Sequence, residues 1–195
     1  YLENIVIEDD HFIFLCLPQF HWALDALGAS KNAEKYGQND VASAINLVFE
    51  KLDKDLFDHI IIFSDHGFKF TYEMKLSSDY MLLNDDRTHT VMIHRKKHQM
   101  DININEKLCS IADIYPTIQD ILGIETHDGF SLFSNNMRNY IVVEDHISFL
   151  PSINQNIELW AVIDREYIYI RKLDRAILID RQSQFEFEVI IDYYD

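Results

Sequence analysis

The chain has 195 residues, of which 48% are hydrophobic and 13% aromatic, enough to bury a sizeable core and to exclude an intrinsically disordered protein. Its 33 acidic and 17 basic residues give a formal net charge of -16, so we expect no broad cationic surface and no nucleic-acid partner. No apolar run reaches the roughly 18–20 residues of a membrane helix, and we expect no membrane segment in this chain.

The two cysteines, Cys16 and Cys109, each lie in an apolar stretch and form no metal-binding pair motif, so we expect two buried thiols and no disulfide framework. The sequence begins at Tyr1 without an initiator Met and soon enters an apolar run. We expect a piece of a longer protein. Its compartment depends on upstream residues, with the cytoplasm slightly favoured.

The first two thirds of the sequence predict an α/β fold, because apolar runs typical of buried strands alternate with helical spacing. A strand, a helix and a strand joined by short connections predict a βαβ unit in a parallel sheet. The expected elements are the strand 12–17, a helix from Asn39 to Leu52, the strand 60–63, a short strand at 91–93, and a helix whose first residue is Pro116 and which Gly123 closes.

Beyond Asn136 the pattern changes to short apolar strands separated by charged, turn-prone residues, which predicts an antiparallel meander. We therefore expect residues 1–138 to form an α/β domain and residues 139–195 a small antiparallel β subdomain. The expected strands are 141–143, 159–163, 167–170 and 177–179.

Polar side chains follow the strand 60–63 in the sequence Ser64-Asp65-His66-Gly67. In open parallel sheets, sites form beyond the carboxyl ends of strands, and a carboxylate beside an imidazole can direct two ligands at one metal ion. The alternative is that Asp65 and His66 are ordinary polar turn residues, which the spacing alone favours.

A second group of candidates lies beyond the strand 12–17, where His21 and Asp25 are expected in a loop that opens onto the same cleft. His21 has the alternative of a histidine packed by its aromatic neighbours. His89 could contact an anion, and Asp145-His146 could supply a remote ligand, although loop or structural roles are favoured for them. The cationic run 94–98 is expected to be a solvated loop rather than an anion-recruiting patch.

Three motifs and the carboxyl-terminal segment, in this order, resemble the carboxyl-terminal half of the alkaline phosphatase and sulfatase superfamily. The apolar strand ending in Ser64-Asp65-His66-Gly67 resembles the S-D-[HN]-G element of that superfamily. The segment 112–124 resembles its D-x-x-P-T helix, through Asp113, Pro116 and Thr117. The segment 128–132 resembles the D-G-x-S-L element, and residues 160–180 are similar to the small sheet that ends sulfatases.

This resemblance implies a partial three-layer αβα sheet of the alkaline phosphatase-like type, followed by a small antiparallel sheet. It implies that Asp65 and His66 bind a divalent metal ion, Ca, Mg, Mn or Zn, and that His21 contacts the oxyanion as a catalytic residue. Asp25 and His89 are then substrate-binding candidates. Ala29 stands where the phosphodiesterase branch has a histidine, which favours the sulfatase-like or lipoteichoic acid synthase-like branch.

The implied function is a metal-dependent hydrolase or transferase that attacks sulfate or phosphate esters in line, with a nucleophile from an amino-terminal half that this sequence lacks. The expected substrates are small-molecule or glycan sulfate or phosphate esters. One alternative is a non-catalytic relative that binds partners or anions, and another is an unrelated α/β domain in which Asp65-His66 is incidental. The transferred group, the alcohol portion and the oligomeric state stay open.

Overall fold

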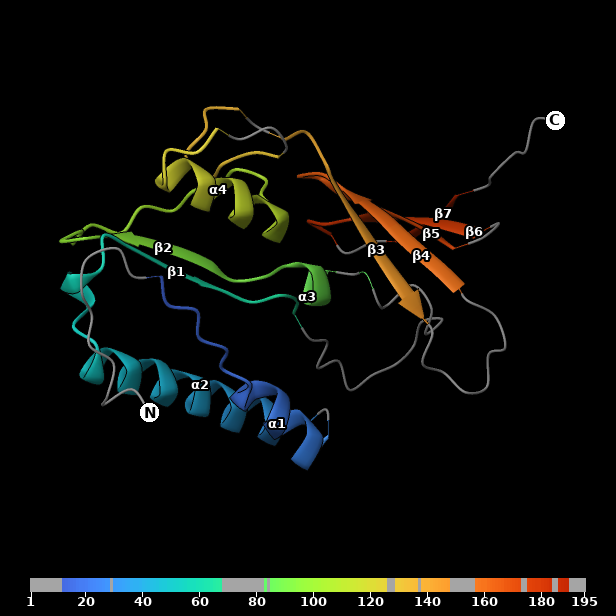
Figure 1. Cartoon of the computed structure of the whole chain (residues 1–195). Coiled ribbons are helices and arrows are strands. Elements are labelled where there is room, and N and C mark those ends of the chain that lie inside the picture. Colours follow the sequence, from blue (N-terminus) through green and yellow to red (C-terminus); the bar gives the residue numbers. More distant parts are fainter. Residues whose placement is uncertain are drawn as a thin grey trace. The chain divides into compact units, whose positions relative to one another are not determined.

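The computed structural model describes residues 12–28, 30–67, 83, 85–125, 129–136, 138–147, 157–172, 175–183 and 186–189 (Figure 1). These residues form two compact units. One unit contains the described residues of 12–63 and 91–102, and the other those of 64–67, 83–90 and 103–189. Segments of the two units alternate along the sequence. The predicted domain boundary between residues 138 and 139 stays a prediction.

The first unit begins with two packed helices, α1 (Gln19–Leu27) and α2 (Lys31–Lys51), followed by the 3₁₀ turn η2 (Lys54–Leu56). The Ser30 hydroxyl caps α2 by accepting a 3.1 Å hydrogen bond from the Ala33 amide. A side chain at Gly37 would place its Cβ 2.7 Å from the Phe20 ring, so glycine permits the close approach of α1 and α2. The helix thus starts eight residues before the Asn39 start predicted from the apolar pattern.

The same unit contains a two-stranded sheet of β1 (His59–Phe63) and β2 (Met92–Lys96), which pair antiparallel with Ile61 opposite His94. The predicted strand at 12–17 is wrong: this segment has no regular structure, and Phe12 and Phe14 are about 70% exposed (72% and 69%). The predicted parallel βαβ unit is therefore wrong for the described residues. An apolar run supplies strand propensity, but it does not specify a partner strand.

The second unit contains the short helix α3 (Asp85–Thr88), the 3₁₀ turn η4 (Ile111–Asp113) and the helix α4 (Ile114–Ile121). Pro116 is the third residue of α4 rather than the first, because η4 leads directly into the helix. Gly123 lies just past the carboxyl end of α4 with φ 67°, the left-handed conformation predicted for it.

The rest of this unit is the five-stranded antiparallel sheet β3 (Ile141–Ile147), β4 (Ile157–Ile163), β5 (Tyr167–Lys172), β6 (Arg175–Asp180) and β7 (Glu186–Val189). Strands adjacent in sequence are adjacent in the sheet, so the predicted meander is confirmed. Alternate residues of β4, β5 and β6 are buried on one face and form a core with Leu83. They are Leu159, Ala161, Ile163, Ile168, Ile170, Ile177 and Ile179.

The described residues therefore form a mixed α/β chain with an antiparallel sheet toward its carboxyl end, as predicted. None of the helices in the described ranges combines the length and the apolar character needed to cross a bilayer. The prediction of buried thiols is wrong, because Cys16 and Cys109 are both exposed residues, although the Cys109 thiol is partly covered.

Candidate metal centre

Asp65 and His66 follow β1 closely, in a turn that local hydrogen bonds hold together. The carboxylate oxygen Oδ1 of Asp65 accepts a 3.0 Å hydrogen bond from the amide of His66. The amide of Gly67 donates a 2.6 Å hydrogen bond to the carbonyl of Arg87. Hydrogen bonds thus hold the backbone amides of His66 and of the residue after it, Gly67.

The imidazole of His66 is oriented by its own turn. Its Nδ1 lies 2.8 Å from the carbonyl oxygen of Gly67. Because a carbonyl only accepts, Nδ1 carries the hydrogen of the neutral ring, and the lone pair is on Nε2. Metal-binding histidines commonly have this arrangement, with one nitrogen held by a backbone carbonyl and the other directed at the ion.

The second donor of the pair is the Asp65 carboxylate, whose Oδ2 lies 3.8 Å from His66 Nε2. Metal–ligand bonds of about 2.0–2.6 Å place neighbouring ligands about 3–4 Å apart, so both atoms can bind one divalent ion. The side chains are 82% and 53% exposed for Asp65 and His66. Within the described residues no group of three or more His, Cys, Asp or Glu gathers to bind a metal, so Asp65 and His66 are a candidate pair of ligands only.

The turn that carries Asp65 and His66 is anchored through α3. Arg87, whose carbonyl accepts from Gly67, forms a 2.9 Å ion pair with Asp145 of β3. Asp85, at the start of α3, forms a 2.9 Å ion pair with Arg181 after β6. These four side chains are between 21% and 34% exposed. Sequence patterns do not reveal this anchor, because its partners are 58 and 96 residues apart and form no local motif.

The other candidate residues lie in different surroundings. His21 and Asp25 are in α1, not in a loop as predicted, and their side chains meet at 3.4 Å one helical turn apart, both about 70% exposed (72% and 66%). His89 follows α3 and is exposed, with its amide donating to the carbonyl of Asp85. Asp145 lies inside β3 and pairs with Arg87, a structural role. Ala29 lies outside the described residues, and so does the side chain of His146.

The structure gives the residues of the D-x-x-P-T motif structural roles. Asp113 is 2% exposed, and its carboxylate accepts from the Ser110 amide and from two nitrogens of Arg138. Thr117 donates to the carbonyl of Asp113 and accepts from the amide of Leu132. Together, these contacts tie α4 to the segment 129–138 that follows it.

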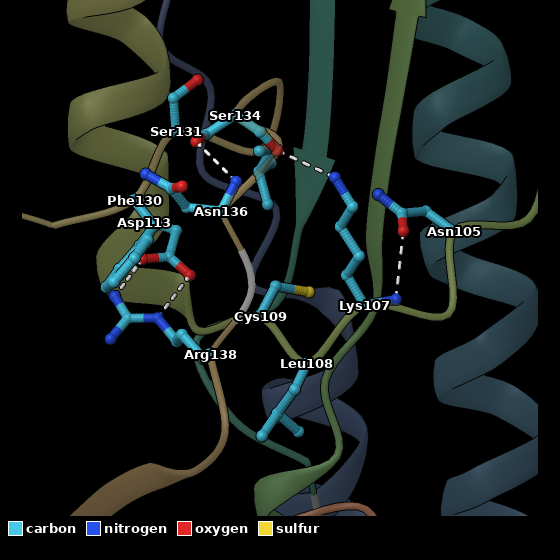
Figure 2. A pocket seen from close by; sticks show the side chains of 11 residues that line it. Asn105, Lys107, Leu108, Cys109, Asp113, Phe130, Ser131, Ser134, Asn136 and Arg138 are labelled. Carbon is cyan, nitrogen blue, oxygen red and sulfur yellow. Dashed lines mark hydrogen bonds and ion pairs between the residues drawn. The ribbon is translucent and has the colours of Figure 1, made fainter.

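The second motif packs directly on the first. Gly129 has φ 90°, and a Cβ there would lie 3.1 Å from Pro116, so glycine suits both its conformation and its contact. The hydroxyl of Ser131 donates a 2.6 Å hydrogen bond to Asp120. Asp128, the first residue of the D-G-x-S-L element, lies outside the described residues. Figure 2 shows this region, where a cavity of about 20 Å³ has room for about one water molecule.

Cys109 lies at this cavity. Partial burial of its thiol, and then the nearby Asp113 carboxylate, raise the pKa of Cys109. A raised pKa disfavours the thiolate, so this cysteine is a poor nucleophile.

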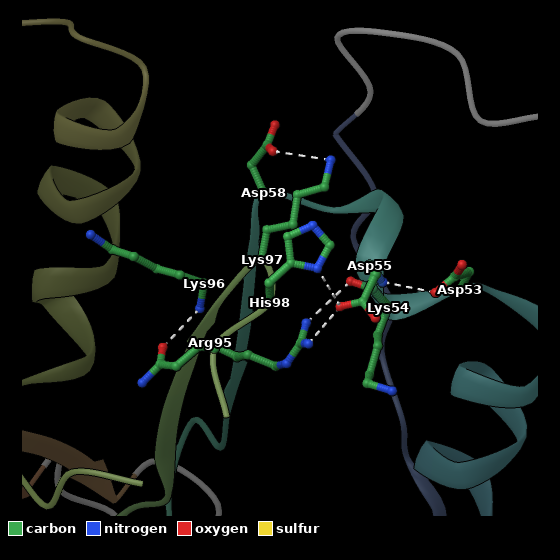
Figure 3. Close-up of polar contacts among 9 residues, drawn as sticks. Asp53, Lys54, Asp55, Asp58, Arg95, Lys96, Lys97 and His98 are labelled. Carbon is green, nitrogen blue, oxygen red and sulfur yellow. Dashed lines mark hydrogen bonds and ion pairs between the residues drawn. The ribbon is translucent and has the colours of Figure 1, made fainter. Parts of the chain in front are cut away.

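The cationic run 94–98 forms the end of β2 and the turn after it (Figure 3). Arg95 forms a 2.7 Å ion pair with Asp55, and this hydrogen bond holds the pKa of the Asp55 carboxyl below its usual value. Lys97 lies 3.6 Å from Asp58, and His98 lies 3.7 Å from Asp55. Three of its five side chains thus lie against carboxylates. The predicted loop is wrong for residues 94–96, which belong to β2.

Comparison with known proteins gives sulfatases as structural neighbours. No protein-family model and no curated protein sequence matches the chain. Among solved structures, a 2-O GAG sulfatase is similar with a TM-score of 0.58 and 18% identity, over 78% of this chain and 36% of the other. A candidate sulfatase from Bacteroides thetaiotaomicron is similar with a TM-score of 0.57 and 18% identity, over 93% of this chain and 48% of the other.

The chain spans between about a third and a half of the length of these neighbours (36% and 48%). At 18% identity the likeness concerns the fold and not the chemistry. The mixed α/β arrangement, with its antiparallel sheets, is therefore a sulfatase-like fold.

Proposed function

We propose that this chain is part of a metal-dependent hydrolase or transferase that acts on sulfate or phosphate esters. The observation that carries the proposal is the Asp65–His66 pair, in which the Nε2 lone pair of His66 and the carboxylate of Asp65 are close enough to bind one ion. The sulfatase-like fold supports the same assignment.

Asp65 and His66 would hold the divalent ion. The bound ion would neutralise charge on the oxygens of the transferred group. The remaining donors and the nucleophile would be supplied by residues outside the described ranges.

His21 would protonate the departing alcohol from Nδ1, because its Nε2 lies 3.4 Å from the Asp25 carboxylate, which would orient the ring. His89 would contact the substrate oxyanion. Since one structural neighbour is a 2-O GAG sulfatase, sulfated glycans are the first substrate class to test.

The test is turnover of an aryl sulfate, an aryl phosphate and a sulfated glycan by the full natural polypeptide, with Mn²⁺ or Ca²⁺ added after treatment with a chelator. We expect metal-dependent release of the alcohol, which Asp65→Asn abolishes. Asp58→Asn is a matched control, because Asp58 precedes β1 and its side chain is 82% exposed, as is that of Asp65. A folded, metal-loaded protein without turnover would indicate a non-catalytic relative instead.

The role of His21 has its own test. His21→Ala should leave the fold intact, because the side chain is 72% exposed, and should lower turnover by about 10²–10⁴-fold if the imidazole is the general acid. The loss should be smallest for esters with a good leaving group, which need no protonation. An unchanged rate on a poor leaving group would remove His21 from the site.

A further inference from the structure

A pair of histidines on facing strands has no role in the proposed reaction. In the β1–β2 ladder His59 is opposite Lys96, and Ile61 is opposite His94. Residues two apart on a strand share a face, and so do residues directly opposite each other. His59 and His94 are therefore diagonal neighbours on one face of the sheet, and both are half-buried.

The two imidazole rings approach each other through their nitrogens. His59 Nδ1 and His94 Nε2 are 3.0 Å apart, while the ring centroids are 5.2 Å apart and the ring planes differ by 24°. A centroid separation so much longer than the nitrogen separation means that the nitrogens face each other at the near edges of the rings. Two nitrogen donors are thus brought together by backbone pairing between positions 35 residues apart.

This spacing is close to what a transition-metal ion needs from two imidazoles. Zinc–nitrogen bonds of about 2.0–2.1 Å at a tetrahedral angle put two ligand nitrogens about 3.3 Å apart. The observed 3.0 Å contact is a hydrogen bond, so one of the two nitrogens carries the shared hydrogen. Metal binding requires that ring to change tautomer, which moves the hydrogen to its other nitrogen. The separation also has to widen by a few tenths of an ångström, which small side-chain rotations provide while the strands stay paired. Water molecules can complete the coordination at a half-buried position.

We propose that His59 and His94 form a bis-imidazole site for a borderline transition-metal ion, Zn²⁺, Ni²⁺ or Cu²⁺. Imidazole donors select these ions, whereas carboxylate and water ligands suit Mg²⁺, Ca²⁺ and Mn²⁺. Its donor set differs from the mixed oxygen and nitrogen set of Asp65 and His66. The His59–His94 site takes part in no step of the proposed reaction.

The charge near the pair has opposing effects. Lys96 lies on the same face opposite His59 and acts electrostatically on His94, so it weakens cation binding. The net charge of -16 favours cations over the whole chain. Arg95 alternates to the other face, where Asp55 neutralises it. A bound ion would fasten β1 to β2 across the diagonal of the ladder.

The experiment is thermal unfolding of the chelator-treated chain with ZnCl₂ or NiCl₂, compared with MnCl₂ and CaCl₂. Binding to the folded state alone raises the unfolding temperature, here by about 2–4 °C or more at saturating Zn²⁺ or Ni²⁺. His59→Gln and His94→Gln should each lose this rise. His98→Asn, which changes an exposed histidine after β2, and Asp65→Asn should both keep it.

A second measurement covers the case in which a histidine variant fails to fold. Cu²⁺ added to the unmodified chain should broaden the imidazole resonances of His59 and His94 before those of His21, His89 and His98. Equal broadening of all histidines, or a Zn²⁺-dependent rise that His59→Gln and His94→Gln retain, would overturn the proposal. Loss of the rise in Asp65→Asn instead would assign the ion to Asp65 and His66.

Discussion

At the scale of single residues, Asp113 shows most clearly how one side chain holds a segment together. It is 2% exposed, it completes a capping box with Ser110, and it binds Arg138 through both carboxylate oxygens. A buried carboxylate is tolerated only when hydrogen bonds and an opposite charge compensate its lost hydration. Here Arg138 supplies the opposite charge, and the Ser110 amide and the Arg138 guanidinium donate the hydrogen bonds.

Removing Arg138 should therefore be costly. Arg138→Ala leaves the buried Asp113 carboxylate without its counter-charge, and we expect the free energy of unfolding to fall by about 3–5 kcal/mol. Asp120→Ala, which removes an exposed carboxylate bonded to Ser131, should cost less than about 1.5 kcal/mol. Urea unfolding of both variants checks the difference. Equal costs would mean that the ion pair of Asp113 is not what holds this segment.

Cys109 gives a prediction about pH. Because burial raises its pKa, the thiolate fraction at a given pH is lower in the folded chain than in the unfolded one. In a Cys16→Ser background, alkylation of Cys109 by iodoacetamide should rise with pH through a higher midpoint in buffer than in urea. A midpoint equal to that in urea, or below it, would contradict the raised pKa.

The sequence predicted part of this residue-level chemistry. The D-x-x-P-T and D-G-x-S-L resemblances pointed to Asp113, Thr117 and Gly129, and the structure places these residues in one module. Their partners could not be predicted, because Arg138 is 25 residues from Asp113 and no local pattern distinguishes it. The roles of Asp65, His66, His21, Asp25 and His89 stay predictions.

At the scale of elements, α3 links the turn that carries Asp65 and His66 to the five-stranded sheet. Gly67 donates to the carbonyl of Arg87, while the side chains of Arg87 and Asp85 form ion pairs with Asp145 and Arg181. A four-residue helix is too short to be stable by itself, so these contacts hold it in place. The orientation of the turn therefore depends on the sheet.

This dependence can be measured with Arg87→Ala. The variant leaves the Asp145 side chain, 21% exposed, without its partner, and we expect a loss of about 1–3 kcal/mol in unfolding free energy. It should also weaken Mn²⁺ binding at Asp65 and His66, because the carbonyl that anchors Gly67 is less well fixed. Arg165→Ala, at an exposed arginine of the same unit, should change neither quantity. Weaker stability with unchanged Mn²⁺ affinity would show that α3 does not orient the turn.

Elements were predictable where periodicity and burial agree. Strands β4, β5 and β6 alternate buried and outward residues. Four of the five strands of this sheet are predicted, each shorter than the strand observed, and β7 is not predicted. The apolar pattern places the start of helix α2 at Asn39 because the first turns of the helix are polar, whereas the structure starts it at Lys31, after the Ser30 cap. The strand predicted at 12–17 is wrong because an apolar run forms a buried strand only where a neighbouring strand pairs with it. Phe12 in this run is 72% exposed.

At the scale of the whole molecule, the candidate residues fall in two units. Asp65, His66 and His89 belong to one, and His21 and Asp25 to the other. The alternation of helices and strands in the sequence predicts the α/β class. It does not predict that β1 and β2 pair antiparallel, because an apolar run does not indicate the direction of the neighbouring strand. The sulfatase-like fold is shared with the structural neighbours, while a metal site at Asp65 and His66 stays a proposal.

The most direct test of this account is calorimetric titration of the chelator-treated chain with Mn²⁺. We predict binding that Asp65→Asn and His66→Ala each abolish, and that Asp58→Asn, at an equally exposed aspartate before β1, preserves. Binding of equal strength in the parent chain, Asp65→Asn and Asp58→Asn would contradict a metal site at Asp65 and His66.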